Sequence, residues 1–282
     1  MADLDLHTFT LPSGARMPTF GLGTWRMGED DRLREAEVAA LRHGLARGVT
    51  LVDTAEMYGD GEAESIVADA VGPNRADVFI VSKVLPQNSS KRGTIAACER
   101  SLKRLKTDYI DLYLLHWRGS PPLAETVAAF AELKAAGKIR DWGVSNFDIA
   151  DMRDLGKVDG AKNCATNQVL YNLSRRGIEF DLMPFCRDRH IPIMAYSPIE
   201  QGRILKHAGL REVAKRHGVS PAQVALAWLI RQDGVITIPK ATTLKHVDDN
   251  LAALDLRLTA DDLATLDKHF PPPKRAVPLD ML

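Results

Sequence analysis

Residues 50–64 of this 282-residue chain read TLVDTAEMYGDGEAE, and they describe one strand–loop–helix unit. The apolar start of the stretch predicts a short strand that stops on a carboxylate, Asp53. A polar, glycine-bearing loop then presents Tyr58 five residues later, and a helix is predicted near 62–71. Because a strand followed by a covering helix is the building unit of parallel α/β proteins, the number of such units in the chain decides the fold.

The unit recurs along the whole chain. Predicted strands lie at 20–25, 51–53, 78–83, 109–116, 142–145, 165–169, 191–196 and 235–239. Segments with apolar residues at helical spacing follow them, at 32–47, 62–71, 95–105, 125–136, 221–231 and 247–254, with Asp148 as a predicted N-cap of one more helix. Continuous apolar strands that alternate with helices indicate a parallel sheet covered by helices. Eight of them favour a closed (β/α)8 TIM barrel over an open sheet.

Further elements are predicted around this barrel. Residues 6–18 predict an N-terminal β-hairpin that turns at Pro12–Gly14, and 210–217 predict an additional helix. A C-terminal helix is predicted at 259–269, where prolines 271–273 end it. No linker or composition shift divides the chain, so the prediction is one α/β barrel domain over residues 1–282.

Composition excludes several classes of function. The 37 basic and 37 acidic side chains cancel, which leaves no global field to attract nucleic acid or an anionic membrane. The three cysteines, Cys98, Cys164 and Cys186, form no CxxC pair and indicate reduced thiols. The start of the chain, MADLDLHTF, is acidic where a signal peptide is basic, and no apolar run is long enough to span a bilayer. These features predict a cytoplasmic protein.

Polar residues stand where the predicted strands end. In order they are Asp53, Lys83, His116, Ser145 with Asn146, Gln168, Tyr196 with Ser197, and Lys240. Each one has a structural alternative, such as a loop anchor, a solvated strand end or a hydrogen-bonded core histidine. In a barrel, however, the active site lies at the C-terminal ends of the strands, so residues from adjacent strands converge there. Convergence of an Asp, a Lys, a His and a loop Tyr therefore favours an active site.

These four side chains suit the reduction of a carbonyl group. A free tyrosine titrates near ~10, and a nearby lysine ammonium is expected to lower that pKa toward the working range. Asp53 is predicted to hold Lys83 charged, while Tyr58 and His116 hydrogen-bond the carbonyl oxygen as negative charge develops on it. Since no protein side chain donates hydride, a cofactor is implied.

Eight motifs in order resemble those of the aldo-keto reductase family over essentially the whole chain. They are GLGTW (21–25), VDTAEMYG (52–59), VSK (81–83), LLHW (114–117), GVSNF (143–147), NQV (167–169), AYSP (195–198) and IPKA (238–241). Within the family, VDTAEMY, LYLLHW and the final LDML are most similar to bacterial members of the methylglyoxal reductase type.

The resemblance implies NADPH-dependent reduction of small aldehydes and ketones by hydride transfer. It implies a catalytic tetrad of Asp53, Tyr58, Lys83 and His116, with Tyr58 as general acid. It further implies that Tyr196 stacks on the nicotinamide, that Ser145, Asn146 and Gln168 bind its carboxamide, and that Gly23 and Thr24 lie along its ribose. Cofactor residues farther out are implied to be Ser197 and Ile199 at the pyrophosphate, and Lys240, Thr243, Asp249 and Asn250 at the adenosine end.

The sequence departs from the family in two places. His246 stands where many relatives have an arginine that holds the 2′-phosphate, so discrimination against NADH is expected to be weaker, with NADPH still preferred because Lys240 and Lys245 supply charge. The segment 118–122 after the fourth strand is short. It predicts an open mouth for small or varied aldehydes, lined by Trp25 and Trp117, which have barrel-rim packing as their structural alternative.

Two other functions remain open at this stage. A Schiff-base aldolase also uses a strand-end lysine, although an Asp that keeps Lys83 protonated argues against an amine nucleophile. A nucleotide-sensing regulatory subunit with little turnover is compatible with an intact tetrad. The histidines are scattered, so no metal site is expected. The resemblance implies a monomer, and the tail at 271–282 is predicted either to cover the active site or to lie on the surface.

Overall fold

The computed structural model describes residues 6–282, and it has the predicted barrel architecture. Eight parallel strands are ordered in space as they are in sequence. They are β3 (Gly21–Gly23), β4 (Leu51–Asp53), β5 (Phe79–Val84), β6 (Ile110–Leu115), β7 (Ile139–Ser145), β8 (Cys164–Leu170), β9 (Ile193–Tyr196) and β10 (Val235–Thr237). Parallel bridges from Phe20 to Thr237 and from Gly23 to Lys240 link the two edges of the sheet.

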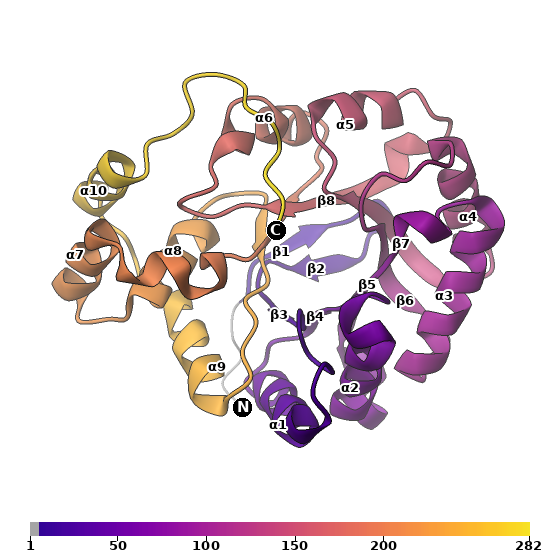
Figure 1. Ribbon diagram of the computed structural model, residues 1–282, viewed down its shortest axis with the longest axis horizontal. Helices are drawn as coiled ribbons and strands as arrows, with labels where there is room; N and C mark the ends of the chain where they lie inside the picture. The colour runs from indigo at the N-terminus through magenta and orange to yellow at the C-terminus, as the bar shows by residue number, and fades with distance from the viewer. Residues whose placement is uncertain (1–5) are drawn as a thin grey trace.

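Helices surround these strands as a ring (Figure 1). They are α1 (Arg34–Ala46), α2 (Glu62–Val71), α3 (Lys91–Leu105), α4 (Leu123–Ala135), α5 (Ile149–Leu155), α6 (Leu182–Arg187), α7 (Ala208–His217), α8 (Pro221–Ile230), α9 (Leu244–Leu251) and α10 (Ala260–His269). Asp148 caps α5 as predicted, because its side chain accepts a hydrogen bond from the Asp151 N–H in a reciprocal capping box. None of the helices within residues 6–282 is long and apolar enough to cross a membrane.

The predicted hairpin is present as β1 (Thr8–Thr10) and β2 (Arg16–Pro18), which pair antiparallel. Leu11 and Met17 from this hairpin pack with the inward side chains of the strands, such as Leu51 and Leu112. The hairpin therefore closes the barrel at the N-terminal ends of the strands. The acidic start of the chain, the argument against a signal peptide, includes residues 1–5, which lie outside the described residues.

Strand β7 begins at Ile139, three residues before the predicted start at Trp142. The start of the strand was not predicted because it contains Arg140 and Asp141, and charged residues are rare in a buried parallel sheet. Asp141 is nevertheless fully buried and is paired there with the Lys134 ammonium at 3.1 Å. A buried charge is tolerated in a strand when it is paired in this way.

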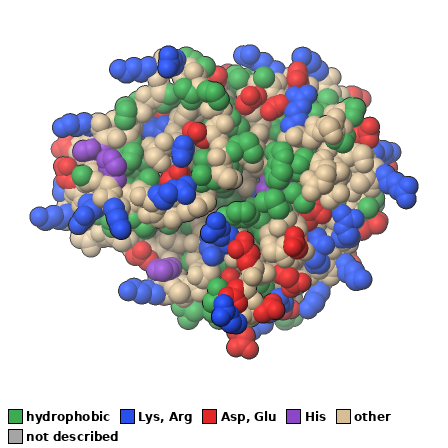
Figure 2. All heavy atoms as spheres, in the orientation of Figure 1, with side chains coloured by type: hydrophobic (Ala, Val, Ile, Leu, Met, Phe, Trp, Pro, Cys, Tyr) green, Lys and Arg blue, Asp and Glu red, His purple; other side chains and the backbone are tan. Residues whose placement is uncertain are grey.

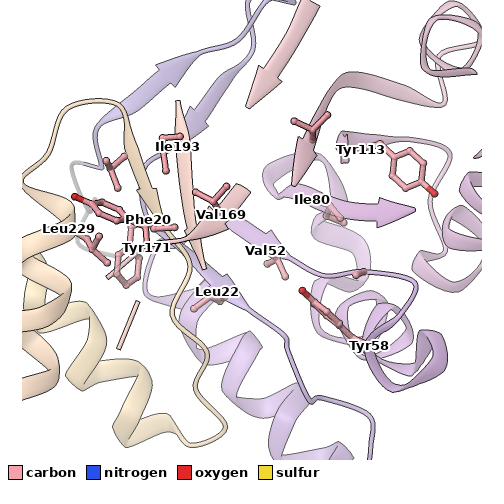
Figure 3. Close-up of a cluster of buried hydrophobic side chains, with 14 of the residues drawn as sticks. Phe20, Leu22, Val52, Tyr58, Ile80, Tyr113, Val169, Tyr171, Ile193 and Leu229 are labelled. Atoms are coloured by element: carbon pink, nitrogen blue, oxygen red, sulfur yellow. The ribbon is translucent and has the colours of Figure 1, made fainter. Parts of the chain in front are cut away.

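Side-chain alternation decides which strand residues face the active site. Leu51 points into the barrel and Val52 toward the helices, so Asp53 points inward at the end of β4. Figure 3 shows members of the outer layer, including Val52 and Ile80, between the strands and the helices. By the same alternation, Val81 and Lys83 share the inward face of β5.

Candidate active site

A cleft of about 500 Å3 opens at the C-terminal ends of the strands, where the sequence predicted the site. Figure 2 shows it as a hollow at the centre of the molecule, bordered by hydrophobic side chains. Residues of the predicted site that line it are Gly23, Trp25, Asp53, Tyr58, His116, Trp117, Ser145, Asn146, Gln168, Tyr196, Ser197, Ile199 and Lys240. The lining thus brings together residues from seven of the eight strand ends, and Lys83, from the end of β5, lies buried behind it.

Lys83 lies at the base of this cleft with no exposed surface. Its Nζ atom donates to the Asp53 carboxylate at 2.8 Å, to the Thr54 carbonyl at 2.8 Å and to the Tyr58 hydroxyl at 3.1 Å. An ammonium group has three donors and no acceptor, so these three contacts use its full capacity. Burial lowers the pKa of Lys83, but the Asp53 carboxylate opposes that shift. The geometry therefore fits a charged lysine and leaves no lone pair for an amine nucleophile.

Tyr58 is buried above Lys83, with its ring 5.0 Å from the Trp25 ring and 5.8 Å from the His116 ring, centroid to centroid. The expected decrease in its pKa is wrong. Burial, and next the Asp53 carboxylate, raise the pKa of Tyr58 well above its ordinary value. The phenol therefore keeps its proton at neutral pH. Because the hydroxyl oxygen accepts from Lys83, its own hydrogen remains free to be donated into the cleft.

His116 is neutral in this environment. Burial, and next the Lys83 charge, hold the pKa of His116 well below its ordinary value. Its Nδ1 atom is buried and has no hydrogen-bond partner among residues 6–282. A neutral imidazole carries one N–H, so His116 can donate one hydrogen bond to a ligand without bringing a charge.

Amide and hydroxyl side chains form the next part of the cleft wall. Gln168 donates through Nε2 to the second oxygen of Asp53 at 2.7 Å, which fixes that carboxylate against Lys83. Asn146 donates to the His116 carbonyl at 3.1 Å and accepts from the Tyr196 hydroxyl at 3.0 Å. Ser145 lies against Asn146, whose amide is 3.3 Å from its hydroxyl. These contacts fix the orientation of the three side chains. They also use some of the donors and acceptors that were predicted to bind the nicotinamide carboxamide.

Two cationic side chains also line the cleft, Lys240 and one residue that the sequence analysis missed, Arg26. Within residues 6–282 neither side chain is paired with a carboxylate. Arg26 follows the GLGTW motif and has a left-handed backbone (φ 63°), which brings it to the cleft. Its place directly after that motif was the signal that could have identified it. Two free cations in one cleft suit an anionic ligand.

Five predicted cofactor residues do not line the cleft. Thr24 is fully buried and donates its hydroxyl to the Asp53 carbonyl at 3.0 Å. The other four lie on α9 and its N-cap: Thr243, His246, Asp249 and Asn250. Thr243 caps α9 by accepting from the His246 N–H at 3.2 Å, and both are exposed. Asp249 accepts from Ser220 at 3.0 Å and from Gln223 at 2.9 Å.

The C-terminal tail reaches the mouth of the cleft. In Figure 1 it runs from α10 across the ring of helices and ends near the centre of the barrel. Asp280 is bound there by Arg175 at 3.2 Å, and Met281 and Leu282 line the cleft beside Trp25 and Trp117. Of the two positions predicted for the tail, the structure has the one at the active site. Met57 also lines this end, which the sequence analysis missed.

The three cysteines are unpaired and lie in the core, away from the cleft lining. Burial raises the pKa of Cys98, Cys164 and Cys186 to about 12. Because the thiolate is the reactive form, we expect none of them to react with a thiol reagent at pH 8 in the native protein and all three to react after denaturation. A colorimetric thiol assay with and without guanidinium measures this directly, and a fast native thiol would contradict it. Within the described part of the chain, no cluster of three or more His, Cys, Asp or Glu residues is placed to bind a metal.

Comparisons with known proteins define the class. The model of the Aldo/keto reductase family matches residues 19–270. The methylglyoxal reductase YeaE of Escherichia coli K12 is 54% identical over 271 residues, which cover 94% of this chain and 95% of the relative. The glyoxal reductase of Bacillus subtilis is 35% identical over 92% of this chain and 91% of its own. The chain therefore belongs to the aldo/keto reductase family and is an oxidoreductase.

A solved structure agrees with this assignment. The aldo-keto reductase of Klebsiella pneumoniae, solved in complex with NADPH, has a TM-score of 0.95 to this structure at 49% identity. The match covers 99% of this chain and 100% of the other. The two proteins therefore share the same fold over almost their whole length.

Proposed function

We propose that this enzyme reduces small, uncharged aldehydes and ketones, such as methylglyoxal, to alcohols with NADPH, and that Tyr58 is the general acid. The main observation in support is the hydrogen bond from Lys83 Nζ to the Tyr58 hydroxyl oxygen at 3.1 Å, which leaves the phenol hydrogen free for the substrate. His116 donates a second hydrogen bond to the same carbonyl oxygen. Together they stabilise the negative charge that develops on it.

The residues of the cleft fit a nicotinamide dinucleotide. Arg26 and Lys240 are free cations for its phosphates, and the Gln168, Asn146 and Ser145 side chains offer polar groups at the inner end. Tyr196 is half-buried at the cleft wall, and we assign its ring to stacking on the nicotinamide. NADPH bound there supplies the hydride. The NADPH complex of the Klebsiella relative and the methylglyoxal and glyoxal reductase names of the others support this proposal.

The choice of small, uncharged substrates rests on the outer end of the cleft. Four large side chains of the lining, Trp25, Met57, Trp117 and Met281, carry no charge, and the Trp25 ring packs against Tyr58. The two cations of the cleft, Arg26 and Lys240, are assigned above to the cofactor phosphates, so a carboxylate on the substrate would lose its hydration without gaining a cationic partner of its own. The loop that follows β6, at 116–122, is short, and the tail residues Met281 and Leu282 border the same cleft.

The deciding experiment mixes purified protein with NADPH and methylglyoxal and follows consumption of the reduced cofactor. NADH and pyruvate serve as comparisons, one for the cofactor and one for a substrate with a carboxylate. We expect rapid loss of NADPH with methylglyoxal, slower loss with NADH, and little with pyruvate. Consumption of neither cofactor across a panel of aldehydes would contradict the reductase function and favour the nucleotide-sensing alternative. Covalent trapping of Lys83 by borohydride would instead support an aldolase, which its three hydrogen bonds disfavour.

The expected pH dependence follows from the protonation of the two proton donors, His116 and Tyr58. The His116 pKa is lowered, so this residue is neutral, and a donor without charge, at every pH above that value. The Tyr58 pKa is raised, so the proton is retained up to that value. We therefore expect kcat/KM for methylglyoxal to be constant between about pH 7 and pH 9, with losses only outside this range. A steep decrease within it, in steady-state assays at constant ionic strength, would contradict the assigned protonation states.

We further propose that the protein works as a monomer in the cytoplasm. The three unpaired cysteines fit a reducing compartment.

A further inference from the structure

The loop between β4 and α2 carries Tyr58, and two residues before it stands a second acidic side chain, Glu56. This residue is 8% exposed and is absent from the lining of the cleft. It therefore does not touch a ligand bound in the cleft. A carboxylate that is buried so close to the general acid, yet outside the cleft, needs a structural reason.

The reason lies in the loop after β5. Glu56 Oε1 accepts from the Leu85 N–H at 2.7 Å and from the Asn88 side-chain amide at 2.9 Å. The Glu56 N–H itself donates to the Lys83 carbonyl at 3.3 Å. Leu85 is two residues after Lys83, just as Glu56 is two residues before Tyr58. One carboxylate thus ties the loop of the general acid to the loop that leaves the lysine strand.

A third loop packs against the turn at residues 86–89, which belongs to the loop after β5. Gly119 follows Trp117, and a Cβ atom added to it would lie 2.5 Å from the Pro86 carbonyl oxygen and 2.6 Å from the Ser89 hydroxyl. The segment that carries His116 and Trp117 therefore packs directly against residues 86–89. Any movement of that turn would be passed to both donors of the site.

We propose that Glu56 is a positioning residue, which holds Tyr58 at hydrogen-bonding distance from Lys83 by clamping the loops after β4 and β5 together. The clamp acts through hydrogen-bond acceptance and depends little on charge, because the nearest cation, Arg100, is half-exposed and 3.5 Å away. The inference rests on the proposed role of Tyr58. Reaction rates are sensitive to such placement, since an error of about 1 Å can cost roughly 100-fold.

Two substitutions of Glu56 test separately its role as a hydrogen-bond acceptor and its negative charge. Glu56→Gln keeps an oxygen that can accept from Leu85, and we expect its kcat to stay within about threefold of wild type. Glu56→Ala leaves the Leu85 N–H without its acceptor, and we expect kcat to fall by about 10- to 100-fold while the Kd for NADPH changes by less than about twofold. Arg100→Gln is the matched control, which removes the exposed partner of the carboxylate and should leave kcat unchanged.

A readout independent of activity accompanies the kinetics. Amide hydrogen exchange at Leu85, followed by NMR, should accelerate at least about tenfold in Glu56→Ala and stay near wild type in Glu56→Gln. With deuterated NADPH, the isotope effect on kcat in Glu56→Ala should exceed that of wild type, because the chemical step is slowed. If Glu56→Ala does not fold, Asn88→Ala, which removes one of the two donors, should lower kcat without changing the Kd for NADPH.

Several outcomes would overturn the inference. Faster exchange at Leu85 with unchanged kcat would make Glu56 a purely structural clamp, and an equal loss in Glu56→Gln or in Arg100→Gln would make the charge decisive. Unchanged exchange at Leu85 in Glu56→Ala would disprove the clamp itself, even in a protein without turnover. Failure of the proposed function is distinguished by the wild-type enzyme, which would then consume no NADPH with any aldehyde.

Discussion

Tyr58→Phe is expected to lower kcat for methylglyoxal by about 100- to 10,000-fold, the range typical for loss of a general acid. The ring and its contacts with Trp25 and His116 remain, and only the hydroxyl that Lys83 orients is removed. Binding of NADPH should be unchanged within about twofold, because the substitution removes no charge from the cleft. Stopped-flow measurement of a single turnover and fluorescence titration with NADPH check the two parts separately.

The chain offers a matched control in Tyr113. It is fully buried, and its hydroxyl has no hydrogen-bond partner among residues 6–282. Figure 3 shows it away from Tyr58, and its ring packs against Phe130 of α4. Tyr113→Phe should leave kcat at the wild-type value. A loss in Tyr58→Phe no larger than in this control would refute Tyr58 as the proton donor.

Lys83→Met is expected to lower the free energy of unfolding by about 3–5 kcal/mol and to abolish most turnover. Among residues 6–282, the substitution leaves the Asp53 carboxylate, at 2% exposure, with only the Gln168 amide as a side-chain partner. It also removes the donor that orients Tyr58. Urea unfolding monitored by circular dichroism measures the first effect, and the NADPH assay measures the second.

A second substitution separates these two effects. In the double variant Asp53→Asn/Lys83→Met the uncompensated charge is gone, so most of the lost stability should return. Turnover should stay as low as in the single variant, because the phenol still lacks its partner. Equal stability of Lys83→Met and wild type would show that the pair adds no net stability, and recovered turnover in the double variant would contradict the role of Lys83.

Much of the architecture was predictable from the sequence because the signals are local. Apolar runs that alternate with helical stripes indicated the parallel barrel, and Asp148 marked the start of α5. The polar residues at the strand ends converge in a barrel whatever the details of packing, so Asp53, Lys83 and His116 were predicted to meet before any distance was known. The charged start of β7 was missed, because the pairing of Asp141 with Lys134 joins another element.

The orientation of the site's side chains and the position of the tail were decided only by the tertiary structure. Trp142 of β7 pairs with Cys164 of β8, and Val144 pairs with Asn167. Strand β8 therefore has one more residue than β7 between these two pairs, and this irregularity turns Gln168 toward Asp53. The tail at the cleft mouth depends on the long-range pair of Arg175 and Asp280.

The sequence by itself determined which residue types gather at the end of the barrel, since strand order and alternation follow from local patterns. It did not determine their proton affinities. Proximity to Lys83 suggested a lowered Tyr58 pKa, whereas in the folded protein burial and Asp53 raise it. Desolvation depends on every neighbour that excludes water, most of them distant in sequence, and so the protonation state of this site is a property of the packed structure.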